Sequence, residues 1–435
     1  MKENDLLCNP HAHLSRRTLL GAGAGGAMLS TIANQLAWAD ATGVTDPSKP
    51  KNVILLWLEG GPSQLETFDP HPGTKYGGDV KAISTSTPDL MIADTLPQVA
   101  ERMHLGSLVR SVTSKEGDHQ RAIYNMKTGY RPDPTLVHPS IGSILCHEFP
   151  ESLDIPRHIS ITPQNFPARG GYFGPVYDAF KIGDPKNPVP DLDSPVAEGR
   201  FDRRIESLRW LEKRFRQGRL RDLDNNRTLH TASTDQALRM MSSEQVDAFD
   251  VSNESKSTLE KFGDTPFGRG CLAATRLIRS GVRCVEITLG GWDSHVTNHS
   301  LQTGRCEILD PALAALLDRL VEEEMLENTL VVCGGEFGRT PTINPAEGRD
   351  HWPHGFSVFL AGCGVRKGGV YGATAATPKL DPDKPLQDVG NPITIGDLHA
   401  TILSTLGVEY DREEQTPVGR PLRLSEGDPV KDLLV

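Results

Sequence analysis

The feature that most constrains the fold is a continuous apolar run near the start of the chain, Asn52–Leu58, which stops at Glu59-Gly60-Gly61-Pro62. A strand with apolar side chains on both faces belongs in the centre of a parallel sheet that helices cover on both sides. The polar, glycine-rich residues after it then form a loop at the carboxyl end of the strand. The run therefore predicts an α/β fold with functional residues at its strand ends.

Other segments repeat this pattern. Five more runs predict strands, at Leu105–Val112, His158–Ile161, Val282–Leu289, Thr329–Cys333 and Phe356–Ala361. Helical spacing of apolar residues occurs at Phe267–Ser280, Cys306–Met325 and Ile395–Leu406. The alternation predicts a three-layer α/β sandwich around a mainly parallel sheet.

One stretch breaks the alternation. Residues from about 199 to 261 are rich in Arg, Asp and Glu with helical spacing, which predicts a helical insertion. A proline-rich loop at 181–198 is expected to lead into it.

Charge and hydropathy exclude two kinds of partner. The chain has 46 Lys+Arg against 57 Asp+Glu, a formal net charge of −11, whereas a nucleic-acid-binding surface needs a basic stripe. No apolar run reaches 18 residues, so no transmembrane segment is expected.

The N-terminus predicts export. Ser15-Arg16-Arg17 precedes a Gly/Ala-rich stretch at 21–33, and Ala37-Trp38-Ala39 offers small residues to a signal peptidase. Paired arginines before a mildly apolar segment are typical of twin-arginine leaders. We therefore expect residues 1–39 to be a leader, residues 40–435 to form one domain, and the protein to be periplasmic or secreted.

Four polar clusters follow predicted strands, where ligands bind in open parallel sheets. They occupy residues 59–69, 118–121, 290–295 (with His299 one helical turn on) and a last region that runs from 335–340 to 349–354. Carboxylates and imidazoles without cysteine suit Zn²⁺, Mn²⁺, Mg²⁺ or Ca²⁺. Each residue alone could be an ordinary cap or loop residue, but together the clusters predict a divalent-metal site.

These motifs resemble a known family. The residues that carry the resemblance are Ser15-Arg16-Arg17, Gly60-Gly61-Pro62-Ser63-Gln64, Thr67-Phe68-Asp69-Pro70, Thr128-Gly129, Gly291-Trp292-Asp293-Ser294-His295, Gly335-Glu336-Phe337-Gly338-Arg339-Thr340, Gly348-Arg349-Asp350-His351-Trp352-Pro353, Lys367-Gly368-Gly369 and Asp397-Leu398. The sequence is similar to exported proteins of the domain-of-unknown-function family numbered 1501, which is grouped with the alkaline phosphatase and sulfatase superfamily. The resemblance implies an alkaline phosphatase-like sandwich with metals at the strand ends.

The resemblance also implies which residues hold the metal. They are Glu59, Asp293, His295, Glu336, Asp350 and His351. Asp69 is an alternative to Glu59, and His299 is an alternative to His295.

The sequence departs from the superfamily at the nucleophile. Sulfatases place a Cys-x-Pro-Ser-Arg segment ten residues before a Thr-Gly pair, and counting back from Gly129 lands on His119. The remaining candidates for attack are Ser63, Thr113, Ser114 or a metal-activated water. His119 could then be a metal ligand or a general acid.

The leading hypothesis is an exported metal-dependent hydrolase of phosphate or sulfate esters. Arg121 or Arg339 would neutralise the anionic substrate, because a guanidinium grips two oxygens at once. One alternative is a catalytically inactive metal- or glycan-binding surface protein of the same fold. A serine hydrolase that uses Ser63 is a weaker alternative, since the Gly-x-Ser-x-Gly elbow is absent.

Overall fold

Strand β1 (Asn52–Glu59) lies inside a mostly parallel sheet because both of its faces are apolar. The computed structural model describes residues 51–150, 152–164, 166–216 and 229–435. The described residues belong to one compact unit. The predicted leader at 1–39 lies outside the described residues.

Among the described residues, nine strands form one sheet in the order β12-β4-β11-β8-β1-β7-β5-β6, with β15 pairing with β4. All pairings are parallel except those of β11, which runs antiparallel to both β4 and β8. The fold is thus α/β around a mainly parallel sheet, as the sequence predicted.

The sheet strands are β1, β4 (Gly106–Thr113), β5 (His158–Ile161), β6 (Phe180–Ile182), β7 (Cys284–Gly290), β8 (Thr329–Gly334), β11 (Phe356–Ala361), β12 (Gly369–Tyr371) and β15 (Ile393–Thr394). Short pairs form outside it: β2 (Ala82–Ser84) with β3 (Met91–Ala93), β9 (Gly338–Arg339) with β10 (His351–Trp352), β13 (Ala373–Thr374) with β14 (Val389–Gly390), and β16 (Glu413–Gln415) with β17 (Pro421–Arg423). The helices are α2 (Pro97–Ala100), α3 (His119–Thr128), α4 (Ile141–Glu148), α5 (Glu198–Arg216), α7 (Leu229–Met241), α8 (Lys256–Lys261), α9 (Pro266–Arg279), α10 (Asn298–Glu322) and α11 (Ile395–Thr405).

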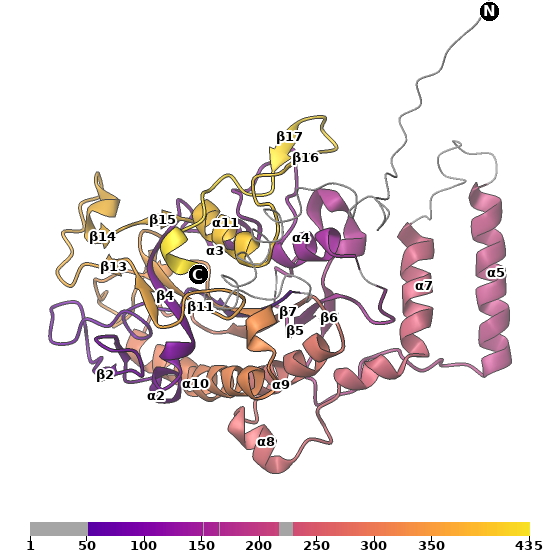
Figure 1. Cartoon of the computed structure of the whole chain (residues 1–435), viewed down its shortest axis with the longest axis horizontal. Coiled ribbons are helices and arrows are strands. Elements are labelled where there is room, and N and C mark those ends of the chain that lie inside the picture. Colours follow the sequence, from indigo (N-terminus) through magenta and orange to yellow (C-terminus); the bar gives the residue numbers. More distant parts are fainter. Residues whose placement is uncertain (1–50, 151, 165, 217–228) are drawn as a thin grey trace, which may run out of the picture. The chain divides into compact units, whose positions relative to one another are not determined.

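Helices cover both faces of the sheet (Figure 1). Ile54, Leu56 and Leu58 of β1 belong to the core that α9 and α10 complete. Val53 and Trp57 point the other way, into the core formed with α3, α4 and α11. The period-two alternation of a strand thus divides one apolar run between two cores.

The stretch predicted as a helical insertion contains α5, α7 and α8 and, among its described residues, no strand. A contact of 2.6 Å between Nδ1 of His230 and Oε1 of Glu212 joins α7 to α5. The preceding segment, expected to be loop throughout, begins instead with β6, which pairs with β5. The pattern in Phe180–Ile182 is only three residues long, too short for periodicity to distinguish it from a loop.

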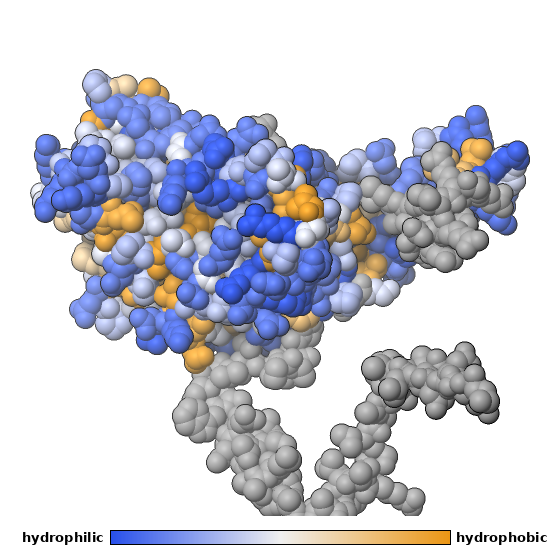
Figure 2. Space-filling model, turned by 90° about the horizontal axis from the view of Figure 1, so that it is seen from above, coloured by the Kyte–Doolittle hydropathy of each residue, from blue (hydrophilic) through white to orange (hydrophobic). Residues whose placement is uncertain are grey.

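The face of the molecule in Figure 2 is largely hydrophilic, with apolar side chains in small scattered groups. No described helix has the length and apolar character needed to cross a bilayer.

Candidate metal centre

The predicted clusters meet at one edge of the sheet because the strands before them are parallel neighbours. β1 pairs with both β7 and β8, so Glu59, Gly290 and Gly334 end at the same edge. The loops after β7 and β8 carry the Asp293 and Glu336 motifs. α3, which follows β4, begins at His119.

The last cluster arrives through a short strand pair. β9 and β10 are antiparallel, with His351 opposite Arg339 and Trp352 opposite Gly338. The Thr340 N–H donates to the Asp350 carbonyl (2.8 Å), and the Asp350 N–H donates to the Thr340 hydroxyl (3.0 Å), which extends the pairing by one step. Residues twelve apart in the chain are therefore side by side.

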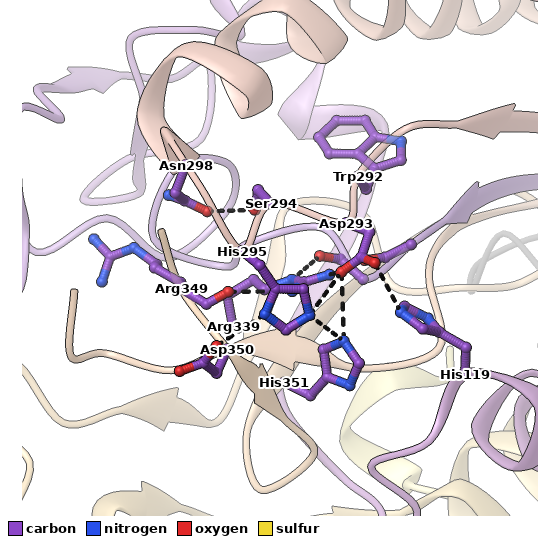
Figure 3. Close-up of polar contacts among 12 residues, drawn as sticks. His119, Trp292, Asp293, Ser294, His295, Asn298, Arg339, Arg349, Asp350 and His351 are labelled. Atoms are coloured by element: carbon purple, nitrogen blue, oxygen red, sulfur yellow. Dashed lines mark hydrogen bonds and ion pairs between the residues drawn. The ribbon is translucent and has the colours of Figure 1, made fainter. Parts of the chain in front are cut away.

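His119, Asp293, His295 and His351, here called the ligand cluster, converge on one point (Figure 3). From the Asp293 carboxylate, Oδ2 lies 3.4 Å from Nε2 of His119, and Oδ1 lies 3.1 Å from Nε2 of His295 and 3.4 Å from Nε2 of His351. The Nε2 atoms of His295 and His351 are 3.0 Å apart. The atoms of His119, Asp293 and His351 that could bind an ion all lie within 4.8 Å of one another.

Each imidazole is fixed through its other nitrogen. Nδ1 of His351 lies 2.7 Å from the carbonyl oxygen of Gly117, which can only accept a hydrogen bond. Nδ1 of His119 lies 2.7 Å from Oε1 of Glu336, and Nδ1 of His295 lies 2.8 Å from Oδ1 of Asp350. These partners assign the proton of each neutral ring to Nδ1 and leave a lone pair on Nε2.

The ligand cluster therefore presents three nitrogen lone pairs and a carboxylate to one another. Two lone pairs 3.0 Å apart repel unless a cation or a proton lies between them. Ligands at 2.0–2.1 Å around a tetrahedral ion are separated by about 3.4 Å. Four separations within the cluster are 3.0–3.4 Å, and the three residues whose ligand atoms all lie within 4.8 Å of one another are His119, Asp293 and His351. Histidines whose second nitrogen donates to a carboxylate or carbonyl are also typical of metal sites. The residues fit a divalent cation.

The charges of the region support the same conclusion. Asp293, Glu336 and Asp350 face a single guanidinium, that of Arg339. Three carboxylates against one guanidinium leave two negative charges before any imidazole is protonated. One divalent cation would balance them.

The surroundings shift the pKa values of three ligand-cluster residues in different directions. Burial disfavours protonated His119, but the hydrogen bond and charge of Glu336, with the charge of Asp293, outweigh it and raise its pKa. Burial would raise the pKa of Asp293, but the Arg339 guanidinium lowers it. Burial lowers the pKa of His351, and its hydrogen bond to Gly117 only partly opposes this. These shifts favour ionised Asp293 and neutral His351, the forms that bind metal, whereas the raised pKa of His119 favours its protonated form, so a bound ion would have to displace that proton.

Below the ligand cluster lies a layer of fully buried charges, Glu66, Glu336, Arg339 and Arg349, here called the supporting layer. Arg339 donates from Nη2 to Asp293 Oδ1 (2.7 Å) and to the carbonyl of Gly60, and from Nε to the carbonyl of Gly61 (2.9 Å). The guanidinium expected to neutralise substrate is thus bonded to protein oxygens and holds Asp293 in place.

The tight loop after β1 explains its glycines. Gly60 has φ +119° and donates its N–H to Glu336 Oε1 (2.9 Å). A Cβ at this position would lie 2.6 Å from the backbone nitrogen of Asp293. Only glycine lets the β1 loop approach the β7 loop this closely.

Ser63 belongs to the buried network rather than to the ligand cluster. Its hydroxyl donates to Glu66, whose Oε1 also accepts from Arg349 Nε (3.1 Å) and Nη2 (3.0 Å). Its backbone N–H donates to Gln302 Oε1 (2.9 Å). The side chain is fully enclosed, and its hydroxyl partner is Glu66 rather than a residue of the ligand cluster.

Glu59 and Arg121 also lie outside the ligand cluster. Glu59 is mostly buried, and this burial raises its pKa, partly offset by the charge of Lys127 and reinforced by that of Glu336. Arg121 donates from Nε (2.6 Å) and Nη2 (3.1 Å) to the carboxylate of Glu116.

The remaining candidates from the sequence analysis bond to other residues or lie outside the ligand cluster. Asp69 accepts from the backbone N–H (3.0 Å) and hydroxyl (2.7 Å) of Thr374. The hydroxyl of Thr113 donates to the Ile393 carbonyl (2.9 Å), and that of Ser114 contacts Asn125 Oδ1 (3.3 Å). His299 is the second residue of α10, and its buried Nδ1 has no partner among the described residues.

Three contributors were not identified from the sequence. The Gly117 carbonyl is a backbone atom, which leaves no residue-type signal. Phe337 packs against His119 and His351, with ring centroids 4.9 and 4.4 Å apart. Arg349 was noted as part of a motif, but its burial with Glu66, some 280 positions away, has no local signature.

Structural comparisons find similar architectures at low identity. A protein in the alkaline phosphatase superfamily from Vibrio parahaemolyticus matches with TM-score 0.38 and 13% identity, over 86% of this chain and 75% of that one. PsFucS1 sulfatase from Pseudoalteromonas sp. matches with TM-score 0.40 and 12% identity (88% and 72%). A phosphonate monoester hydrolase from Silicibacter pomeroyi matches with TM-score 0.36 and 10% identity (88% and 76%).

A search of curated protein sequences finds no match. The sequence profile described as "Protein of unknown function (DUF1501)" matches residues 50–434, almost all of the described chain. The protein therefore belongs to the DUF1501 family.

Proposed function

We propose that this protein is an exported, metal-dependent hydrolase of phosphate or sulfate esters. The observation that supports the proposal most strongly is the convergence of three Nε2 atoms on the Asp293 carboxylate at separations of 3.1–3.4 Å. The side chains of Asp293 and His295 are 47% and 45% exposed, so an ester in solution can reach the ligand cluster.

The donor set narrows the choice of ion. Three imidazoles and one carboxylate suit Zn²⁺ or Mn²⁺ better than Ca²⁺ or Mg²⁺, which prefer oxygen ligands. When bound, such an ion polarises an ester oxygen and lowers the pKa of a coordinated water. His119, Asp293, His295 and His351 would hold it.

The remaining residues prepare these ligands. Glu336 and Asp350 accept hydrogen bonds from the Nδ1–H groups of His119 and His295, which leaves each Nε2 free to bind a metal ion. Arg339 keeps Asp293 oriented and ionised. The Ser63 hydroxyl is enclosed and bonded to Glu66, and those of Thr113 and Ser114 are engaged with other residues, so we assign attack on the ester to water.

The test is hydrolysis of phenyl phosphate and phenyl sulfate esters by residues 40–435 loaded with Zn²⁺ or Mn²⁺. We expect turnover that His351→Ala and His119→Ala abolish and that His354→Ala retains. His354 is a suitable control because it lies three residues from His351 and packs against Trp352 instead of belonging to the ligand cluster. Turnover that survives in His351→Ala would contradict the proposal.

A second candidate function is metal-dependent binding of anionic glycans without hydrolysis. The observation that favours it is that the three candidate hydroxyl nucleophiles are engaged elsewhere. Saturable binding of a sulfated glycan by metal-loaded protein, with no release of sulfate or phosphate from any ester tested, would select this function.

We propose export by the twin-arginine route on the basis of Ser15-Arg16-Arg17 and the residues up to Ala39. Replacement of Arg16 and Arg17 by lysine should leave the protein in the cytoplasm of a host with this pathway. Export of the Lys-Lys variant at the wild-type level would contradict the proposal.

A further inference from the structure

A second charged group lies on the loop that leads into the ligand cluster. The carboxylate of Glu116, only 5% exposed, accepts from Arg121 Nε (2.6 Å) and Nη2 (3.1 Å) and from Arg131 Nε. The two arginine side chains are 48% and 56% exposed. Two guanidiniums therefore share one buried carboxylate. The charge of Asp118 also acts on Arg121, so it is Lys115 on the same loop that brings this group of five charges to a net charge of one positive.

The chain fixes this group near the ligand cluster. Glu116 immediately precedes Gly117, whose carbonyl holds His351, and is three residues before His119. Consecutive Cα atoms are 3.8 Å apart, so the Cα atoms of Glu116 and His119 are within about 11 Å of each other. The two groups are close enough to contact one extended substrate.

Arg131 is the better oriented of the two for a ligand. It contacts Glu116 through Nε alone, so both terminal nitrogens have no partner among the described residues. A guanidinium held through Nε presents these two nitrogens as a planar fork, which matches two oxygens of a sulfate, phosphate or carboxylate. Lys115, exposed on the same loop and in no ion pair with a described residue, adds a third cation.

We propose that Arg121 and Arg131, positioned by Glu116, bind a second anionic group of the substrate, next to the ester that the ligand cluster hydrolyses. The substrate class is then a polyanion, an ester whose alcohol part carries at least one more sulfate or phosphate. This inference rests on the proposed function. It also explains how a chain of net charge −11 can attract an anionic substrate, because the substrate interacts with the local positive charge of the arginines and not with the net charge of the whole chain.

Binding measurements test the arginine pair independently of turnover. Labelled dextran sulfate, polyphosphate and neutral dextran would be titrated into metal-loaded residues 40–435 at low salt. We expect binding of at least one of the two anionic polymers and none of neutral dextran. Arg121→Gln and Arg131→Gln should each weaken it about tenfold, whereas Arg131→Lys should weaken it less. Preference for one polymer identifies sulfate or phosphate as the second group.

Arg279→Gln is the matched control. Arg279 is 60% exposed and makes one ion pair with Glu323 (3.2 Å). It lies on α9, which packs in the core with α10, whereas α3 packs in the core on the opposite face of the sheet. Each variant would also be checked for an unchanged thermal midpoint. Equal affinity in wild type, Arg121→Gln and Arg131→Gln, or an equal loss in Arg279→Gln, would overturn the inference.

Kinetics separate failure of this inference from failure of the proposed function. With an ester that carries a second anionic group, Arg131→Gln should raise KM and leave kcat nearly unchanged. With phenyl phosphate or phenyl sulfate, which lack that group, it should change neither. Polymer binding that needs the arginines, without hydrolysis of any ester, would refute the hydrolase and retain the anion site.

Discussion

The ligand cluster and the supporting layer are in contact but differ in almost every physical respect. Side chains of the ligand cluster are 22–47% exposed, whereas those of the supporting layer are 0–1% exposed. The cluster brings together lone pairs that repel one another, whereas the layer forms many hydrogen bonds, to Asp293, to Glu66 and to backbone carbonyls, although Oε2 of Glu336 has no partner among the described residues. Geometry in the cluster is thus maintained by residues that solvent and substrate do not reach.

Because of this difference, substitutions in the ligand cluster should affect metal binding, and substitutions in the supporting layer should affect folding stability. Removal of a buried charge leaves its partner unpaired at low dielectric, which costs several kcal/mol. Removal of a half-exposed ligand lets water replace it at little cost to folding. Changes in the supporting layer should therefore unfold the metal-free protein, and changes in the ligand cluster should abolish metal binding without doing so.

The largest effect on stability is expected for Arg349→Ala. Arg349 donates to Glu66 and to the carbonyls of Thr340, Pro341 and Tyr76, and its loss leaves the Glu66 carboxylate without its guanidinium partner. We expect metal-free protein to lose about 3–5 kcal/mol of unfolding free energy, measured by urea denaturation. Arg279→Ala, which removes an exposed ion pair, should cost less than about 1 kcal/mol. Equal losses of unfolding free energy in Arg349→Ala and Arg279→Ala would show that the supporting layer stabilises the fold no more than a surface ion pair does.

Gly60→Ala should have the next largest effect. The new methyl group would meet Asp293 N at 2.6 Å in a backbone conformation that alanine disfavours. We expect a loss of about 1–3 kcal/mol together with weaker metal binding, because the displaced loop carries a ligand. Gly73→Ala is the control: Gly73 has φ +72° but open space around it, so it should cost about 1 kcal/mol and leave metal binding intact. If both variants bind metal like wild type, the close approach of the two loops does not hold Asp293.

Ser63→Ala tests the buried network against the serine-hydrolase alternative. The change removes one donor to Glu66 and should cost about 1–2 kcal/mol, with metal content and hydrolysis preserved. A loss of activity by several orders of magnitude at wild-type metal content would instead make Ser63 the nucleophile.

Asp350→Asn should change stability least. The Asp350 side chain is 58% exposed, so unfolding of the metal-free protein should shift by less than about 0.5 kcal/mol. Because Asp350 orients His295, metal affinity should fall about 10- to 100-fold, measured by competition with a chelator. Asp383→Asn, at another exposed aspartate, should alter neither quantity.

The sequence predicted the fold well where the signal was a continuous apolar run. The predicted strands His158–Ile161 and Phe356–Ala361 match β5 and β11 in their bounds. It did not predict the antiparallel direction of β11. Strand direction depends on the path of the preceding connection, here through the β9–β10 pair, rather than on the strand's own residues.

The sequence could predict which residues of the candidate site lie near one another, but not what each of them contacts there. Parallel strands bring their carboxyl ends together, which is why motifs around His119, Asp293 and His351 could be grouped from the sequence. Whether a carboxylate faces an ion or the N–H of an imidazole is decided at a scale of about 3 Å by tertiary packing. For that reason the sequence could not show that the carboxylates of Glu336 and Asp350 contact the Nδ1 atoms of His119 and His295.

The most direct test of the central claim is the metal content of desalted residues 40–435, with His351→Ala and His354→Ala measured beside them by elemental analysis. The account predicts about one equivalent of Zn or Mn in wild type and in His354→Ala, and none in His351→Ala, with all three equally stable once metal is removed. Wild-type protein that retains no stoichiometric metal after folding with excess ions would contradict it, because the convergence of three imidazoles on Asp293 would then serve no cation.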